Sequence, residues 1–212
     1  MRVRTVEESI YNYEDLLKIE NKELKEKCFK NWRESVYLAT EEVEKTLEKF
    51  KDMLGIEAHY NYNEFGGDIN FESSFDDEIL ELEGIRLLKY IYNNYDNNLF
   101  KGKYFSLWSK KDISYKYYKE GYPVLKARYS KVIKENTCVL SGVCFDEDIL
   151  EPIYSFIKNP KGYNFEDLIN ECLESWLKCA INDYSYQLSE EYFLEETENN
   201  QNEFTEDGEI LN

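Results

Sequence analysis

The stretch from residue 164 to residue 181 limits the fold most, because it carries the strongest apolar stripe at helical spacing in this sequence. Asn164, with Asp167 three residues later, resembles a capping box, in which side chains accept hydrogen bonds at the start of a helix. The stripe consists of Phe165, Leu168, Ile169, Cys172, Leu173, Trp176, Leu177, Ala180 and Ile181. Apolar residues three and four apart share one helix face, so we predict a long helix that buries this face in a core.

Other stretches also have helical spacing. Apolar residues recur in this way over 11–32 and 77–95 and, as a clean stripe, over 43–54. Gly55 is placed to end the helix over 43–54, as a C-cap glycine does. The helix over 77–95 is expected to end in a loop that contains Asn93, Asn94, Asn97 and Asn98.

Polar and apolar side chains alternate on both sides of Gly66-Gly67, which indicates a β-hairpin with its turn at these glycines. The two strands cover residues 59–65 and 68–72. Because successive strand residues point to opposite faces, the acids of the second strand should share one face and its apolar residues the other.

Helices dominate this prediction, and further short strands are predicted at residues 3–6 and 137–145. Residues 204–211 are expected to form a turn with a short strand. The expected fold class is therefore α+β, with amphipathic helices packed on a small antiparallel sheet. Residues 1–212 are expected to form a single domain, and a division into two subdomains near residue 100 is the alternative. Residues 195–212 form an acidic tail whose order is left open.

Composition separates this chain from disordered acidic proteins. Its hydrophobic share is 42% and its aromatic share is 16%, whereas disordered acidic chains are poor in aromatic residues. The first residues lack the apolar run of a signal peptide, and no run of eighteen apolar residues occurs. We therefore expect a folded protein of the cytoplasm, with no membrane contact.

Patterns that indicate catalysis or metal binding are scarce. His59 is the only histidine, which removes most histidine-based triads and two-histidine zinc sites. The five cysteines include no C-x-x-C pair, and no glycine-rich phosphate loop occurs. Asp146-Glu147-Asp148 lacks the spacing of a calcium loop and is better explained as the acidic first turn of a helix. We expect no enzyme activity, no cofactor and no metal site.

Charge is distributed unevenly along the chain. There are 26 basic and 44 acidic side chains, which give a formal net charge of −18. Residues 101–136 carry ten bases against three acids, whereas residues 52–85 and 179–212 each carry ten acids and no lysine or arginine. Neighbouring like charges repel, so this segregation calls for an explanation.

One interpretation of the acidic stretches is nucleic-acid mimicry, in which carboxylates spaced like backbone phosphates enter a groove lined by basic side chains. The candidate partner-binding residues are Glu64, Asp68, Glu72, Asp76, Asp77, Glu78, Glu190, Glu191, Glu195 and Glu196. The plainer interpretation is that both stretches are solvated faces. The expected partner is a basic nucleic-acid-binding protein, because a chain this acidic should itself repel nucleic acid.

The basic segment, residues 101–136, interleaves lysines with tyrosines. This pattern is typical of surfaces that stack bases and contact phosphates. Because the rest of the chain repels nucleic acid, we expect the segment instead to meet the chain's own acids or those of a second subunit. A homodimer is therefore one alternative.

Two stretches carry a recognisable motif. The first is Tyr11-Asn12-Tyr13-Glu14-Asp15-Leu16, and the second is Ser189-Glu190-Glu191-Tyr192-Phe193 followed by Asn200-Gln201-Asn202-Glu203-Phe204-Thr205-Glu206-Asp207-Gly208. They resemble the start Y-x-[FY]-x-E-L and the ending S-E-E-Y-[FI] with N-x-x-E-F-T-x-D-G of small acidic proteins from bacteriophages and mobile elements of Firmicutes. Asp15 departs from the glutamate of that pattern.

The resemblance implies an inhibitor of host defence, such as an anti-CRISPR protein. Together with the charge distribution, it gives the hypothesis of a non-enzymatic, phage-encoded protein that binds a CRISPR effector. The expected effector is Cas9, and binding would block its target DNA binding or cleavage. Two alternatives stay open. One is an antitoxin-like or regulatory partner that neutralises a basic protein, and the other is a hydrolase with a carboxylate-bound metal.

Overall fold

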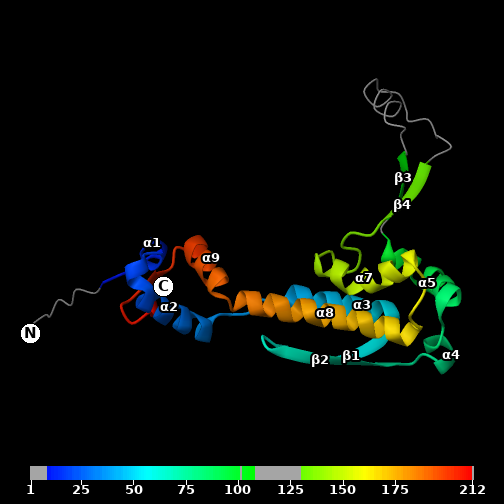
Figure 1. Ribbon diagram of the computed structural model, residues 1–212, viewed down its shortest axis with the longest axis horizontal. Coiled ribbons are helices and arrows are strands. Elements are labelled where there is room, and N and C mark those ends of the chain that lie inside the picture. Colours follow the sequence, from blue (N-terminus) through cyan, green and yellow to red (C-terminus); the bar gives the residue numbers. More distant parts are fainter. Residues whose placement is uncertain (1–8, 101, 108–129, 212) are drawn as a thin grey trace, which may run out of the picture. The chain divides into compact units, whose positions relative to one another are not determined.

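The structure of this chain is a computed structural model that describes residues 9–100, 102–107 and 130–211 (Figure 1). The strand predicted at residues 3–6 lies outside the described residues. So does the part of the basic segment between residues 108 and 129, and with it most of the pattern of lysines and tyrosines.

The contacts within the chain define two compact units. Unit 1 comprises residues 1–41, 60–68 and 177–212, and unit 2 comprises residues 42–59 and 69–176. No boundary between the units lies near residue 100. The single-domain organisation stays a prediction, and the units are described separately below.

The described residues have an α+β fold, as predicted. The helices are α1 (Tyr13–Leu16), η1 (Ile19–Asn21), α2 (Lys22–Ser35), α3 (Glu41–Leu54), α4 (Asp77–Leu80), α5 (Gly84–Leu99), α7 (Phe145–Lys158), α8 (Phe165–Gln187) and α9 (Glu190–Asn200). The strands pair as β1 (Ile56–Asn63) with β2 (Gly66–Ser73), β3 (Gly102–Leu107) with β4 (Ser130–Glu135), and β5 (Glu203–Phe204) with β6 (Ile210–Leu211). None of the described helices has the length and apolar character needed to cross a membrane.

α8 is the helix that the apolar stripe predicts. Asn164 Oδ1 accepts a hydrogen bond of 2.7 Å from the backbone N–H of Asp167, which confirms the predicted cap. The whole predicted stripe is buried except its last residue, Ile181. Trp176 also donates from its indole Nε1 to the carbonyl of Val43 at 2.9 Å, and this bond joins α8 to α3, which runs beside it in Figure 1.

The segment predicted as one helix over 77–95 forms two helices, α4 and α5, with a break between residues 80 and 84. The expected asparagine loop is wrong, because α5 continues through the asparagines. Its buried residues recur at every fourth position, and they are Leu87, Ile91, Tyr95 and Leu99. Burial of this face therefore outweighs the weak helix propensity of asparagine.

β1 and β2 form the predicted hairpin, but the two-residue turn lies at Glu64-Phe65 instead of Gly66-Gly67. Both glycines belong to β2. A β-carbon added at Gly67 would lie 2.7 Å from Cβ of Tyr62 on β1, so the strands approach too closely there for a side chain. The glycine pair thus permits close strand contact and does not form the turn.

The strand predicted at residues 137–145 is wrong, because this segment is a loop around the carboxylate of Asp146. The backbone N–H groups of Leu140, Ser141 and Gly142 donate to this carboxylate at 2.8–3.1 Å. The hydroxyl of Ser141 donates at 2.5 Å and that of Thr46 on α3 at 3.2 Å. Asp146 is buried in the first turn of α7, which confirms that its acidic triplet begins a helix.

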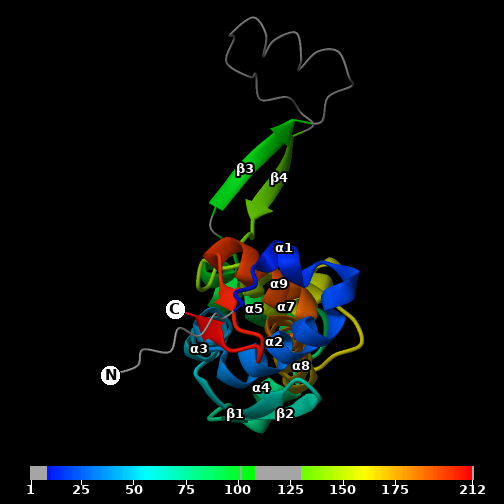
Figure 2. The ribbon, with the colours of Figure 1, turned by 90° about the vertical axis from the view of Figure 1, so that its left-hand side faces the viewer.

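Unit 1 has an apolar core that draws on both ends of the described chain (Figure 2). Its buried members are Leu16, Cys28, Trp32, Phe193 and Phe204. Tyr11 and Phe204 form an antiparallel bridge with hydrogen bonds of 2.9 and 2.8 Å. The hydroxyl of Ser189 caps α9 by accepting from the N–H of Tyr192 at 3.1 Å. Several residues that carry the family resemblance therefore build this unit, and α9, β5 and β6 extend through the acidic tail.

Replacing Gly208 with alanine is expected to lower the free energy of unfolding by about 2 kcal/mol. The φ angle of Gly208 is 80°, and an added β-carbon would lie 2.8 Å from the backbone nitrogen of Cys28 on α2. Gly142→Ala is the matched control, because Gly142 has a φ of 91° but open space around its β-carbon position. Urea unfolding should show a loss of about 1 kcal/mol for this control. Equal losses in the two variants would remove the steric argument.

Candidate functional site

β2 presents acidic side chains on its exposed face. Asp68 and Glu72 are exposed, whereas Ile69 and Phe71 are partly buried, so the predicted alternation is confirmed. Strand residues four apart are separated by about 13 Å along the strand. The carboxylate of Glu72 lies 3.8 Å from the Nε2 atom of His59 on β1.

The acids that follow β2 are exposed as well. Asp76 occupies the N-cap position of α4 without a side-chain capping bond, and Asp77 and Glu78 form the first turn. Within the described part of the chain, no ion pair reaches Asp68, Asp76, Asp77 or Glu78. We call these four residues the unpaired acids.

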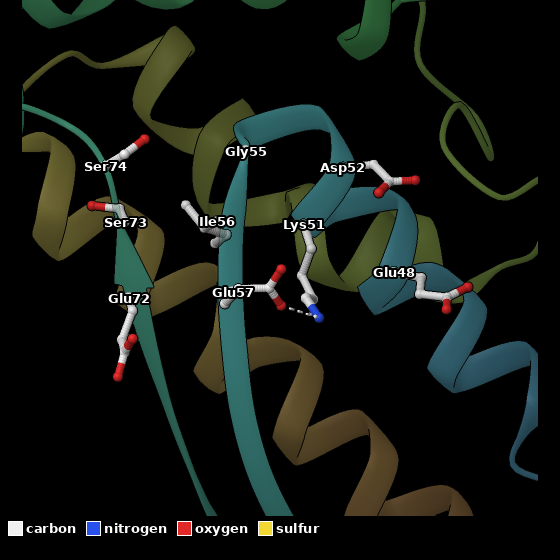
Figure 3. A pocket seen from close by; sticks show the side chains of 9 residues that line it. All are labelled: Glu48, Lys51, Asp52, Gly55, Ile56, Glu57, Glu72, Ser73 and Ser74. Atoms are coloured by element: carbon white, nitrogen blue, oxygen red, sulfur yellow. Dashed lines mark ion pairs between the residues drawn. The ribbon is translucent and has the colours of Figure 1, made fainter.

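Unit 2 also contains an open cavity of about 770 Å³ between the end of α3 and the base of the hairpin (Figure 3). It is lined by Glu48, Lys51, Asp52, Gly55, Ile56, Glu57, Glu72, Ser73 and Ser74. Lys51 and Glu57 form an ion pair at 2.9 Å, which Figure 3 marks. Four carboxylates against one ammonium give the cavity an acidic lining, and Glu72 belongs both to this lining and to the exposed face of β2.

Glu64, one of the candidate residues, has a structural role at the hairpin turn. Its carboxylate forms an ion pair with Arg33 of α2. Its backbone carbonyl accepts a hydrogen bond of 3.3 Å from the hydroxyl of Ser185 on α8. These contacts hold the turn within unit 1, so Glu64 is less available to a partner than its sequence position suggested.

Three of the four candidates on α9 have partners inside unit 1. Glu196 accepts from the indole Nε1 of Trp32 at 2.6 Å, and Glu190 forms an ion pair with Lys25. Glu195 accepts from the hydroxyl of Tyr186 at 2.7 Å, and this hydrogen bond raises the pKa of Tyr186 to about 12. Glu191 is exposed. The second acidic stretch therefore holds α9 in place, and its carboxylates are mostly engaged.

Eight of the ten candidates are exposed, and Glu64 and Glu196 are partly buried. Contacts within unit 1 separate the candidates further. Among the described residues of that unit, no ion pair or side-chain hydrogen bond reaches Asp68, Glu72, Asp76, Asp77, Glu78 or Glu191. Glu64, Glu190, Glu195 and Glu196 make side-chain contacts within unit 1. Interaction with a partner is better supported for β2 and α4 than for α9.

Sequence reasoning missed two features of this region. Glu48 lines the acidic cavity but precedes the all-acidic stretch, because Lys49 and Lys51 follow it in the sequence. Glu48 lies four residues before Asp52 on a predicted helix, and residues four apart share a helix face. This spacing is the sequence signal that places Glu48 beside the acidic stretch. The other feature is Phe65 at the hairpin turn, whose side chain is 88% exposed.

The described residues contain no group of three or more histidine, cysteine, aspartate or glutamate side chains arranged to hold a metal ion. The alternative of a hydrolase with a carboxylate-bound metal therefore gains no support from the described side chains. Comparisons with protein-family models, with curated proteins and with solved structures find no match to this chain.

Proposed function

We propose that this protein is a non-enzymatic inhibitor that occupies the DNA-binding groove of a basic protein with its exposed carboxylates. The observation that carries the proposal is the exposure of the unpaired acids, Asp68, Asp76, Asp77 and Glu78, on a stretch without lysine or arginine. A groove built to hold phosphates supplies the missing cations and releases bound counterions when it is occupied.

The spacing of these charges supports mimicry of a phosphate backbone. Asp68 and Glu72 share one face of β2 at a separation of about 13 Å. Phosphates of one DNA strand recur at roughly 3.4 Å of helix rise, so such a separation corresponds to several nucleotides. Asp76, Asp77 and Glu78 add three consecutive acids to the same stretch. The partner face therefore needs a row of basic side chains, not a single anion-binding position.

The target class follows from the same chemistry together with the resemblance to anti-defence proteins of phages. A CRISPR effector holds nucleic acid in a positively charged channel and reads a short duplex motif with arginine side chains. We therefore propose an anti-CRISPR activity in the bacterial cytoplasm, with Cas9 as the first effector to test. An antitoxin-like role would use the same acidic surface against a different basic protein.

The experiment measures plasmid cleavage by the Cas9–guide complex, and binding of that complex to target DNA, while this protein is titrated at low and moderate salt. We expect cleavage and DNA binding to fall together, with weaker inhibition as salt rises, because salt screens charge contacts. Loss of cleavage with DNA still bound would contradict groove occupancy. Absence of any effect on Cas9 would favour the antitoxin-like alternative.

A further inference from the structure

Phe65 at the hairpin turn is the most exposed large apolar side chain among the described residues, with 88% of its surface open to solvent. Within the described part of the chain, no ring contact involves Phe65. Two-residue hairpin turns favour asparagine, aspartate and glycine, which suit a tight and solvated backbone. Neither packing nor turn geometry therefore accounts for a phenylalanine at this position.

The turn that carries Phe65 is fixed by contacts within unit 1. The backbone N–H of Phe65 donates to Oδ1 of Asn63 at 2.8 Å. The neighbouring Glu64 pairs with Arg33 through its carboxylate and accepts from Ser185 through its carbonyl. A ring on a fixed turn loses little conformational freedom when it binds, so the geometry favours Phe65 as an anchor for a partner.

The residues that flank the ring are polar or acidic. Asn61 and Asn63 are exposed on β1, and Asp68 is exposed on β2, three residues and roughly 10 Å of extended chain after the ring. Arg33 reaches the turn from α2, but Glu64 cancels its charge. The group that covers Phe65 must therefore suit an apolar ring and the negative charge of Asp68 together.

We propose that Phe65 is the stacking site for an arginine side chain in the DNA-binding groove of the basic partner. A guanidinium is planar and weakly hydrated, so it lies on an aromatic face while its N–H groups point to carboxylates or water. A lysine ammonium is more strongly hydrated and gains less from the ring. The next basic side chain of the groove pairs with Asp68. This inference rests on the proposed function and names the chemical group that the hairpin turn contacts.

Short peptides test the stacking without an effector. Calorimetry at low salt compares the binding of hexa-arginine and hexa-lysine peptides, both acetylated and amidated, to the full chain. We expect the arginine peptide to bind more tightly. Phe65→Leu keeps an apolar side chain without an aromatic face, so this preference for arginine should fall about two- to fivefold. Phe65→Tyr keeps the face and should keep the preference. An unchanged preference in Phe65→Leu would overturn the proposal.

The assay of DNA binding by the Cas9–guide complex separates this inference from the proposed function. Half-maximal inhibition should need about 10-fold more of the Phe65→Leu variant than of the unmodified protein. Ile85→Ala, which removes an exposed apolar side chain of α5, should inhibit as the unmodified protein does. Urea unfolding should give equal stability for the Phe65 variants and the unmodified protein, because the side chain is exposed.

The outcomes of the two assays differ for the two proposals. Equal inhibition by Phe65→Leu and the unmodified protein would overturn the stacking role of Phe65 and leave the proposed function in place. Absence of inhibition by the unmodified protein would overturn Cas9 as the target, and the peptide titration then decides by itself whether Phe65 recognises arginine.

Discussion

Replacing Asp146 with alanine is expected to lower the free energy of unfolding by about 3–5 kcal/mol. The buried carboxylate accepts from three backbone N–H groups and two hydroxyls, which link the loop before α7 to Thr46 on α3. Alanine leaves these donors without their acceptor. Thr46 is fully buried like Asp146 and has no access to water, whereas Leu140 and Ser141 are partly buried and Gly142 is exposed. The variant should therefore lose the loop conformation along with stability.

Urea unfolding at neutral pH measures this effect. Asp146→Asn keeps one acceptor oxygen and should lose about half as much stability as the alanine variant. Glu147→Ala is the control, because Glu147 lies in the same first turn of α7 but is exposed. It should change stability by less than about 1 kcal/mol. Similar losses for the buried and the exposed acid would mean that the helix dipole, and not the hydrogen-bonded cage, dominates.

Reversal of four charges, with Asp68, Glu72, Asp76 and Asp77 changed to lysine, is expected to abolish inhibition without unfolding the protein. The four side chains are exposed, so their replacement leaves the cores untouched. Each lysine replaces an attraction to a basic groove by a repulsion. The concentration needed for half-maximal inhibition of target DNA binding should rise at least roughly 100-fold.

A matched variant controls for total charge. Glu44, Glu166, Glu171 and Glu174 are exposed acids of α3 and α8, and their reversal changes the net charge by the same amount. We expect this variant to inhibit within a few fold of the unmodified protein. Circular dichroism checks that both variants stay folded. Undiminished inhibition by the first variant would remove β2 and α4 from the interaction surface, and equal loss in both would indicate a nonspecific charge effect.

Local patterns predicted the elements that depend on neighbours in sequence. The apolar stripe of α8 and its Asn164 cap follow from spacing alone, and so does the alternation of Asp68 and Glu72 with apolar residues on β2. The position of the hairpin turn is harder to predict from sequence, because it depends on how closely Gly67 approaches the opposite strand. Patterns of this kind report which face is buried but not what a strand packs against.

The failures share a physical cause, which is contact between residues distant in sequence. The apolar residues at 137–145 suit a strand, but hydrogen bonds to Asp146 and its contact with Thr46 fix them as a loop. In the candidate site, Arg33 neutralises Glu64 and Trp32 engages Glu196 across 164 positions of sequence. No periodicity reports such partners, so sequence alone does not distinguish the engaged carboxylates of the second acidic stretch from a free surface.

The bridge between Tyr11 and Phe204 imposes an order of events during synthesis on the ribosome. Residues 42–59 and 69–176, which form unit 2, all emerge before the segment that completes unit 1. At translation rates of about 5–20 residues per second, the N-terminal helices wait on the order of ten seconds for their C-terminal partners. Until then the apolar faces of Leu16, Cys28 and Trp32 lack Phe193 and Phe204, the partners that bury them in the finished core. Nascent chains stalled before α9 should accordingly bind chaperones that recognise exposed apolar surface, and chains extended past β6 should release them.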